Sequence, residues 1–433
     1  MQFVSTRGEG KSVGFTEAMF NSLAPDGGLY CPKSMVNLGN FFLELPEDIE
    51  FNRLCSRLTA SLLSPEIASR AAEEIVREAF DFEPTLHRIS EYIQVLELFH
   101  GPSCAFKDFG AAFLASAMSR LLAGKQRRVI ILTATSGDTG SAVAKAFHGK
   151  QNIDVVILYP SKRVSPLQEK QLSTLGGNIT TLEVDGSFDD CQRMVKAAFI
   201  NPSLSHLPLC SANSINLARL IPQSFYYVWA WTRLRSMGDF AFIVPSGNFG
   251  NIAAGLYAAA WGLPVKHFVA ATNANKTIPQ YLETGNYIPR PSISTYSNAM
   301  DVGAPSNFER LDYLYNHDVG VFRNHVMAWS VSDADTIDTM SRVERDFNYL
   351  CCPHTAVGWK VAELYREKNP TLPAVILATA HPGKFMETVK KATGKTPKLP
   401  ASLAAMMRDK KNVTALSGND AALSEWLRQQ FRE

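Results

Sequence analysis

The strongest constraint on the fold is an alternation that begins near residue 125, where short apolar runs take turns with helical patterns. Short apolar runs bounded by turn residues are typical of buried strands. Strands that alternate with helices favour an α/β fold, in which largely parallel sheets are covered by helices. We expect strands at residues 129–132, 154–159, 179–184, 242–244, 267–271 and 375–378. We expect helices at residues 139–148, 166–175, 188–199, 215–235 and 252–261, the fourth of them kinked or broken at Pro222.

Composition and charge exclude several classes of function. A net charge of +2 gives no reason to expect nucleic acid or acidic membranes as partners. The nine histidines and seven cysteines contain no HExxH or CxxC pattern, so we expect no metal site. The odd cysteine count, without a signal peptide, favours a reducing cytoplasm. The uncharged run at residues 240–265 is interrupted by a polar glycine loop, which predicts strand, loop and buried helix instead of a membrane span.

The two ends of the chain carry less information. Two helical patterns near residues 51–63 and 65–80 belong to an N-terminal part without a chemical motif. Residues 391–420 are rich in Lys, Pro, Gly, Asn and Ser, which predicts a surface loop. A last short helix is expected near residues 421–431.

One lysine is set apart by its neighbours. Lys107 lies between Phe106 and Phe109, directly before the alanine-rich residues 111–123, which have the composition of a helix. A lysine just before or on the first turn of a helix loses its proton more easily, because aromatic neighbours exclude water and the helix dipole repels the ammonium. A neutral amine is a nucleophile, and the carbonyl partner we expect is that of pyridoxal 5'-phosphate (PLP). The alternative is a surface cation that pairs with Asp108.

We interpret three polar loops, at residues 133–140, 211–216 and 245–251, as each following a strand and preceding a helix. Ligands of open α/β sheets collect at such places, because unpaired backbone N–H groups and the helix dipole face the same space. The third loop is the best phosphate cradle, since it has two glycines and no basic side chain. Its alternative is a tight turn that binds nothing. The candidate residues are Gly247, Asn248, Phe249, Gly250 and Asn251.

The other two loops suit a carboxylate and a second phosphate. The first loop brings hydroxyl and N–H groups to the start of a helix, which suits a carboxylate; its alternative is a helix cap. The second offers an amide, a hydroxyl and a guanidinium, which suit a phosphate; its alternative is a cap beside a surface arginine. The candidates are Thr135, Ser136, Gly137, Asp138 and Thr139 in the first loop, and Asn213, Ser214 and Arg219 in and after the second.

A fourth feature follows the last expected strand. Thr379 offers a hydroxyl that can face a ring nitrogen, although a neutral partner does not hold such a nitrogen protonated as a carboxylate does. His381 follows shortly after it. We expect this histidine to be satisfied by the backbone at the start of a helix instead of being catalytic.

Taken together, seven stretches in the same order make the chain similar to the threonine synthase family, within the PLP enzymes of fold type II. The resemblance covers almost the whole chain and is to the longer bacterial and fungal branch, which has an N-terminal extension. The matching stretches are HGPSCAFKDFG at 100–110, LTATSGDTGSAVA at 132–144, SPLQEKQLSTLGGNI at 165–179, NSINLARL at 213–220, VPSGNFGN at 244–251, SNAMDVGAPSNFER at 297–310 and ATAHPGKF at 378–385.

The resemblance implies a reaction and a role for each motif. It implies a carbon–oxygen lyase that converts O-phospho-L-homoserine and water to L-threonine and phosphate, by γ-elimination and β-addition of water. Lys107 would form the Schiff base with PLP, the third loop would bind the cofactor phosphate, and Thr379 would face the pyridine nitrogen. The first loop would receive the substrate α-carboxylate and the second the substrate phosphate. Shorter members of the family carry Asn where this chain has Asp138.

The resemblance also implies an organisation. We expect two open, largely parallel sheet domains flanked by helices. The ranges are an N-terminal lead-in domain over 1–95, a smaller PLP and substrate domain over 96–240 and a larger PLP-binding domain over 241–433, with interleaved N-terminal segments. We expect a cytoplasmic monomer or homodimer that acts on a small molecule and binds neither nucleic acid nor membrane. The competing hypotheses are a related PLP lyase that releases phosphate without making threonine, and a silent ligand-binding protein on the same scaffold.

Overall fold

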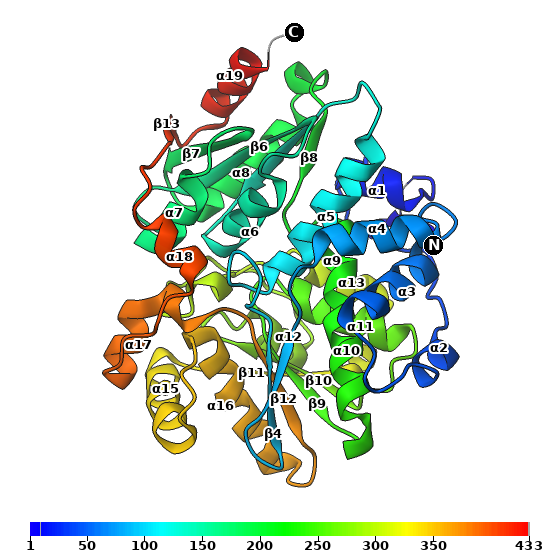
Figure 1. Ribbon diagram of the computed structural model, residues 1–433, viewed down its shortest axis with the longest axis vertical. Helices are drawn as coiled ribbons and strands as arrows, with labels where there is room; N and C mark the ends of the chain where they lie inside the picture. Colours follow the sequence, from blue (N-terminus) through cyan, green and yellow to red (C-terminus); the bar gives the residue numbers. More distant parts are fainter. Residues whose placement is uncertain (9, 432–433) are drawn as a thin grey trace.

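Two sheets organise the molecule, and a computed structural model describes them over residues 1–8 and 10–431. The larger sheet forms the lower half of the view in Figure 1 and has the order β11-β10-β9-β12-β4-β3. Its neighbours run parallel except for β3, which pairs antiparallel with β4. The strands are β3 (Thr85–Arg88), β4 (Ile93–Glu97), β9 (Ala241–Pro245), β10 (His267–Thr272), β11 (Val326–Ser330) and β12 (Ala374–Ala378).

The smaller sheet lies in the upper half of the same view and is parallel throughout, in the order β13-β7-β6-β5-β8. The central strands of both sheets are buried on both faces, which is why they appear in the sequence as continuous apolar runs. All six expected strands are confirmed, each within two residues of its predicted ends. The strands of this sheet are β5 (Val129–Ala134), β6 (Ile153–Pro160), β7 (Ile179–Asp185), β8 (Leu209–Ser211) and β13 (Thr414–Ser417).

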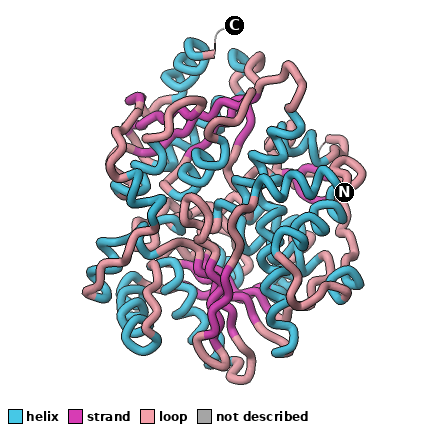
Figure 2. Tube along the Cα trace, in the orientation of Figure 1, coloured by secondary structure: helices cyan, strands magenta, loops and turns pink. Residues whose placement is uncertain are grey.

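Helices cover both sheets, as the cyan tube of Figure 2 shows. The predicted helices are confirmed as α6 (Asp138–Phe147), α7 (Pro166–Ser173), α8 (Phe188–Ile200), α11 (Gly250–Ala260) and α19 (Asp420–Gln430). The expected long helix at 215–235 is broken, as predicted, because Pro222 supplies no backbone N–H. Its parts are α9 (Leu217–Leu220), the short 3-10 turn η2 (Ile221–Gln223) and α10 (Ser224–Leu234).

The helix that carries the candidate lysine begins earlier than the alanine-rich segment suggests. Helix α5 (Lys107–Leu122) has Lys107 as its first residue, so the lysine lies on the first turn. Two N-terminal helices pack beside it: α3 (Phe51–Leu63), which matches the expected range, and α4 (Ser69–Ala79), which begins later than predicted. The ring of Phe109 lies in the core beneath, against Phe51 and Tyr226.

The prediction of a surface loop over residues 391–420 is wrong. This segment contains helix α18 (Ala401–Met406) and strand β13, which pairs with β7. Strand β13 is almost entirely exposed, so its backbone pairing with the sheet edge holds it in place, and no apolar alternation reveals it in the sequence.

The two sheets draw on parts of the chain that the predicted ranges 1–95, 96–240 and 241–433 keep apart. Strands β3 and β4 join the larger sheet, whose other strands all lie after residue 240. Strand β13, near the C-terminus, joins the smaller sheet. The chain therefore enters the larger sheet, leaves it for the smaller one, and returns before its last strand.

The remaining elements complete the layers. A small antiparallel pair, β1 with β2, lies near the N-terminus. None of the helices in the described residues is both long enough and apolar enough to cross a membrane. The further bounds are β1 (Phe3–Ser5), β2 (Tyr30–Pro32), α1 (Phe15–Asn21), α2 (Gly39–Leu43), α12 (Thr277–Thr284), α13 (Phe308–Leu314), α14 (Val319–His325), α15 (Asp333–Phe347), α16 (Pro353–Lys368), α17 (Met386–Thr393), and the 3-10 turns η1 (Pro202–Leu204), η3 (Arg235–Met237), η4 (Asn298–Met300) and η5 (Pro382–Phe385).

Candidate active site

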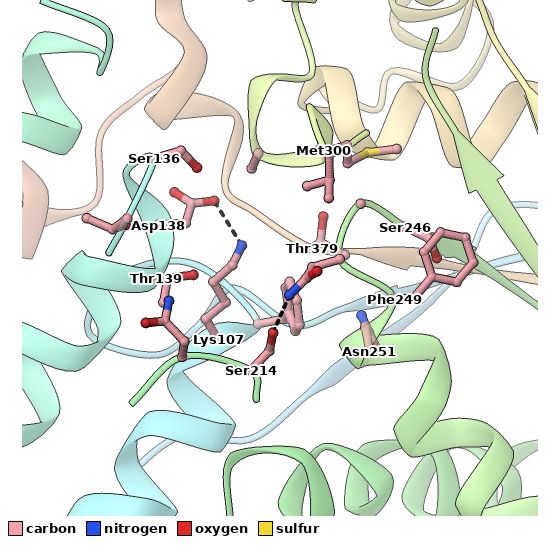
Figure 3. Close-up of a pocket in the computed structure, with 18 of the residues that line it drawn as sticks. Lys107, Ser136, Asp138, Thr139, Ser214, Ser246, Phe249, Asn251, Met300 and Thr379 are labelled. Carbon is pink, nitrogen blue, oxygen red and sulfur yellow. Dashed lines mark hydrogen bonds and ion pairs between the residues drawn. The ribbon is translucent and has the colours of Figure 1, made fainter. Parts of the chain in front are cut away.

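A cavity of about 970 Å³, open space at its mouth included, lies where the carboxyl ends of four strands meet. The segments that follow β5, β8, β9 and β12 supply its walls, so ligand groups can reach the helix starts beyond those strands. Figure 3 shows side chains from these segments around one space. Every candidate site residue predicted from the sequence lines this cavity except Gly137.

Lys107 projects into the cavity from the first turn of α5 (Figure 3). Its Nζ lies 3.7 Å from Asp138 Oδ2 and 4.7 Å from the centroid of the Phe106 ring. Burial lowers the pKa of Lys107, and the nearby cations Lys384 and Arg219 lower it further, whereas Asp138 raises it. The side chain still keeps 17% of its surface exposed to the cavity. It is therefore an accessible amine with a weakened hold on its proton.

The third loop turns sharply from β9 into α11. Phe249 makes this turn in the left-handed region, at φ 60°, directly before the helix begins at Gly250. The first N–H groups of α11 have no partner within the helix, and the loop contains no basic side chain. The hydroxyls of Tyr226 and Tyr227 both donate to Asn251 Oδ1, at 2.6 and 2.7 Å. These bonds fix the amide of Asn251, whose Nδ2 is buried without a partner among the described residues.

Gly247 is required by close packing. A Cβ atom at this position would lie 2.7 Å from Met300 Cα and 3.2 Å from the carbonyl oxygen of Ala299. Both are backbone atoms of a turn that His354 holds, because Ala299 donates its N–H to His354 Nε2 at 3.2 Å. The loop therefore lies against a supported backbone surface.

Ser214 joins the second loop to the third. Its Oγ accepts hydrogen bonds from Asn248 Nδ2 at 2.6 Å and from Asn307 Nδ2 at 3.1 Å. With two donors on the oxygen, the hydroxyl hydrogen remains available to donate into the cavity. Asn213 has a different task, since its amide pairs with both backbone groups of Ala134, at 2.7 and 3.3 Å, and ties the end of β5 to the second loop.

Arg219 is buried on the same wall, with 2% of its surface exposed. One of its terminal nitrogens donates to the Ala212 carbonyl at 2.6 Å, while its Nε has no partner among the described residues. Burial lowers the pKa of Arg219 to about 10, against the attraction of Asp108. A buried guanidinium with an unpaired donor suits an anionic ligand.

The first loop is stabilised from within. Thr135 Oγ1 accepts the N–H groups of Gly137 and Gly140, at 3.0 and 2.8 Å, which leaves its own hydroxyl hydrogen free. Gly137 has φ 137°, and a Cβ there would lie 2.6 Å from Gln168, so this glycine is behind the wall. Asp138 begins α6 and is buried, with Lys384 Nζ 2.7 Å from its Oδ1.

Thr379 lies directly after β12 and lines the cavity, 5% exposed. Its carbonyl accepts the N–H of Phe106 at 2.9 Å, which links the end of β12 to the segment that carries Lys107. His381 Nδ1 accepts the N–H of Gly383 at 3.0 Å at the start of η5. The prediction of a histidine satisfied by the backbone is confirmed.

Sequence reasoning missed two charged or titratable residues at this site. Lys384 lies inside the matched stretch ATAHPGKF, but nothing in the pattern shows that it turns inward. His354 is buried on the cavity wall at the start of α16. Burial lowers its pKa to about 4, which Asp138 opposes and the cations Lys107 and Lys384 reinforce, so this histidine is neutral. A helix-start histidine without spacing to a second one gives no signal in the sequence.

The residues present fit PLP. An accessible lysine with a lowered pKa faces an uncharged helix start across the cavity. Two buried donors on the walls, Asn251 Nδ2 and Arg219 Nε, have no partner within the described part of the chain. Buried donors without a protein partner suit anionic groups of a ligand. Lys107 would hold the cofactor covalently, residues 247–251 its phosphate, and Thr379 would lie at its ring nitrogen.

Comparison with known proteins supports these observations. The model of the family "Pyridoxal-phosphate dependent enzyme" matches residues 86–379, and models of the N-terminal and C-terminal parts of threonine synthase match residues 2–80 and 355–426. The chain is 42% identical to threonine synthase of Haemophilus influenzae, with 91% of each chain covered, and 40% identical to that of Escherichia coli, with 93% and 94% covered. The crystal structure of the Escherichia coli enzyme superposes with a TM-score of 0.93 at 38% identity, covering 99% of this chain and 100% of that one. A PLP-bound threonine synthase from Brucella melitensis gives a TM-score of 0.91 at 36% identity, with both chains fully covered.

Fold and site together define a PLP-dependent enzyme of fold type II. The two largely parallel sheets and the helices that cover them have the architecture of that class. The chain belongs to the threonine synthase family.

Proposed function

We propose that Lys107 and the three loops around it convert O-phospho-L-homoserine and water into L-threonine and phosphate, with PLP as cofactor. Family membership supports this reaction, which is the last step of threonine biosynthesis. One observation carries the assignment of residues: an uncharged anion site at the start of α11 and a guanidinium-bearing site at Arg219 open onto the same amine. A PLP enzyme with a phosphorylated substrate needs two separate phosphate sites, and this cavity offers two of different chemistry.

Substrate binding follows from the donors that the walls leave free. The hydroxyl of Thr135 and the first N–H groups of α6 receive the α-carboxylate, since that helix start concentrates donors. Ser214 donates its free hydroxyl hydrogen to the substrate phosphate, and Arg219 adds charge. Asn213 keeps the two loops in register through its bonds to Ala134.

Lys107 moves the protons. When bound, PLP supplies an electron sink that stabilises negative charge on the substrate carbons near the amino group. Lys107 removes the α-proton as a general base, gives that proton up, and then removes the β-proton; each removal requires the neutral amine that its lowered pKa favours. Arg219 and Ser214 stabilise the charge that develops on the phosphate as it leaves the γ-carbon. A proton then returns to the γ-carbon, water adds at the β-carbon, and a proton returns to the α-carbon, which leaves Lys107 in its starting protonation state.

A product analysis in labelled water tests the reaction. Purified protein with PLP and O-phospho-L-homoserine is expected to release phosphate and threonine in equal amounts, and threonine formed in H₂¹⁸O should carry the label in its β-hydroxyl. Phosphate released with 2-oxobutanoate and without threonine would establish the related lyase instead. Protein that binds PLP and releases no phosphate would support the silent ligand-binding hypothesis. Lys107→Arg, which keeps the charge and the bulk, serves as the matched inactive control.

We further propose that the enzyme is a cytoplasmic monomer or homodimer. The seven cysteines, all within the described residues, are buried and unpaired, as expected in a reducing compartment. The net charge of +2 supports the expectation that nucleic acid is not a partner. Light scattering on a size-exclusion column, with and without PLP, tests the oligomeric state; a larger assembly would contradict the proposal.

A further inference from the structure

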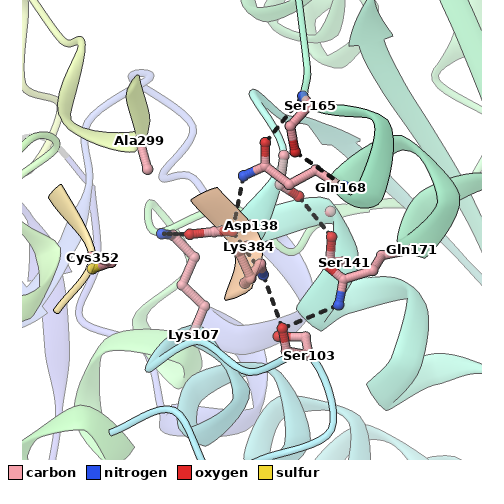
Figure 4. A network of polar contacts seen from close by, with 12 residues as sticks. Ser103, Lys107, Asp138, Ser141, Ser165, Gln168, Gln171, Ala299, Cys352 and Lys384 are labelled. Carbon is pink, nitrogen blue, oxygen red and sulfur yellow. Dashed lines mark hydrogen bonds and ion pairs between the residues drawn. The ribbon is translucent and has the colours of Figure 1, made fainter. Parts of the chain in front are cut away.

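Asp138 lies between two lysines at the edge of the cavity. Its Oδ1 is 2.7 Å from Lys384 Nζ and accepts Gln168 Nε2 at 3.0 Å, while its Oδ2 is 3.7 Å from Lys107 Nζ. Figure 4 shows the carboxylate between the two amines. The carboxylate therefore has its closer partner on the side away from the reactive lysine.

Lys384 is fixed in place. It is fully buried, and its Nζ also donates to the Ser103 carbonyl at 2.8 Å, the same carbonyl that accepts Gln171 Nε2 at 3.1 Å. A buried ion pair of this kind is weak evidence for stability, since apolar residues of similar volume often serve as well. The position of Lys384 beside the reactive amine is better explained by the effect of its charge on Asp138 and Lys107.

The charges that face Lys107 come from four neighbouring elements and from its own helix. Asp138 on α6 attracts a proton to the amine, and Lys384 on η5 and Arg219 on α9 oppose it. His354 on α16 is neutral, and Asp108 on α5 turns away to accept the N–H of Ser103 at 2.9 Å. Lys384 and Lys107 together hold the pKa of Asp138 below its usual range, although burial alone would raise it.

These contacts define what each member does. With Lys384 absent, the carboxylate would have Lys107 as its only ionic partner among the described residues and would hold that amine as an ammonium. With Asp138 absent, Lys384 would be a buried unpaired cation close to the reactive amine. We propose that Asp138 and Lys384 act as a positioning pair for Lys107: Lys384 satisfies the carboxylate, so that the carboxylate orients the amine without holding it as an ammonium. This inference rests on the proposed role of Lys107.

A spectral titration tests the pair in the PLP-bound protein. The measured quantity is the pH at which the absorption band of the cofactor linked to Lys107 is half converted. Lys384→Met should raise this midpoint by about one pH unit, because the carboxylate then attracts the proton unopposed. Asp138→Asn should lower it by a similar amount, and the double variant should lie between the two single variants. Lys390→Met, at an exposed lysine on α17, is the matched control and should leave the midpoint unchanged.

A second readout separates this inference from the proposed function. In cofactor-free protein, the pH dependence of acylation at Lys107, followed by peptide mass spectrometry, should shift in the same directions. Thermal unfolding should show that Asp138→Asn costs more stability than the double variant, since only the single variant leaves Lys384 unpaired. If Lys384→Met does not fold, Lys384→Gln replaces it. Midpoints and labelling profiles that match the wild type in both single variants would overturn the pairing, whereas failure to make threonine with shifted midpoints would overturn only the proposed function.

Discussion

Two walls of the cavity offer different kinds of anion site: one has no charged group and the other has a buried positive charge. The wall proposed to hold the cofactor, residues 247–251 with Thr379, is called the cofactor wall; it contains no basic residue and offers a helix start held by packing. The wall proposed to hold the substrate phosphate, Asn213, Ser214 and Arg219, is called the substrate wall and is centred on a buried guanidinium. Fixed dipoles suit a group that stays through every turnover, while a full charge suits a phosphate whose charge grows as it leaves. The cofactor wall should therefore be sensitive to shape and the substrate wall to charge.

The most severe change removes the group that both walls face. Lys107→Ala should reduce threonine formation by about 10³-fold or more, because the general base is lost along with the covalent link to PLP. Product analysis under saturating substrate gives the loss, and the visible spectrum reports the missing link. A variant that retained wild-type turnover would contradict the role of Lys107, and with it the claim that the walls share one reactive centre.

Arg219→Ala should affect the substrate wall alone. We expect kcat/KM for O-phospho-L-homoserine to fall by about 100-fold, through a higher KM and a lower kcat together, since the guanidinium binds the substrate phosphate and stabilises its charge as it leaves, and a charge-assisted hydrogen bond contributes about 1.5–3 kcal/mol. PLP affinity, measured by spectral titration of the cofactor-free protein, should change little. Arg219→Lys keeps the charge and should recover part of the loss. Loss of PLP binding instead would mean that the two walls are assigned the wrong way round.

His354, which holds the turn that packs against Gly247, tests whether the residue that supports the cofactor wall is neutral. Its native pKa is about 4, against 6.5 ordinarily. Between these values the unfolded chain binds a proton that the native chain does not, so this contribution to the free energy of unfolding is lost as the pH falls. His354→Gln has no titrating group at this position, so its free energy of unfolding does not show this pH dependence. The free energy of unfolding of the variant minus that of the wild type should therefore rise by about 2 kcal/mol between pH 7 and pH 5. Urea unfolding at each pH measures it; a constant difference would contradict a buried neutral histidine.

Gly247→Ala should affect the cofactor wall through shape. The added methyl group would lie 2.7 Å from Met300 Cα, so the loop or the opposing turn must move. An overpacking strain of about 1–3 kcal/mol predicts PLP binding that is weaker by about 10-fold, with KM for substrate little changed in the saturated enzyme. Gly39→Ala on the distant helix α2, where the nearest atom is a side-chain oxygen at 3.3 Å, is the control. Unchanged PLP affinity would show that the wall tolerates a change of shape.

The sequence was informative where one local rule decides the structure. Buried parallel strands appear as apolar runs, so β5, β6, β7, β9, β10 and β12 could be predicted, whereas the buried β4 could not, because Gln94 interrupts its apolar residues. The loop before α11 could be assigned from its glycines and its lack of charge, and the break at Pro222 from the missing N–H. Strand β3 could not, because it is a partly exposed edge strand without a continuous apolar run; β11 is also a partly exposed edge strand, although residues 326–329 are all apolar.

The unpredicted part of the site depends on contacts between distant parts of the chain. Lys384 and Asp138 are far apart in the sequence and meet only because β12 and β5 belong to different sheets whose ends converge. His354 acquires its partner from the turn at Ala299 in the same way. Residue type alone cannot show whether a lysine after a strand turns outward or inward, so the charge balance around Lys107 required the fold.

The smallest expected effect concerns the hydroxyl at the end of β12. Thr379→Val removes the Oγ at nearly constant volume and leaves the backbone bond from Phe106 in place, so the wall keeps its shape. One lost hydrogen bond to an uncharged partner contributes about 1 kcal/mol, which predicts PLP affinity weaker by about 5-fold and a modest fall in kcat. Thr379→Ser keeps the hydroxyl and should bind PLP like the wild type. If Val and Ser weakened PLP equally, packing of the lost groups would be responsible and the hydroxyl would not face the cofactor. If only Thr379→Val weakened PLP binding, the cofactor wall would bind PLP through specific hydrogen bonds as well as through its shape. The two walls would then differ only in that the substrate wall carries a charge and the cofactor wall does not.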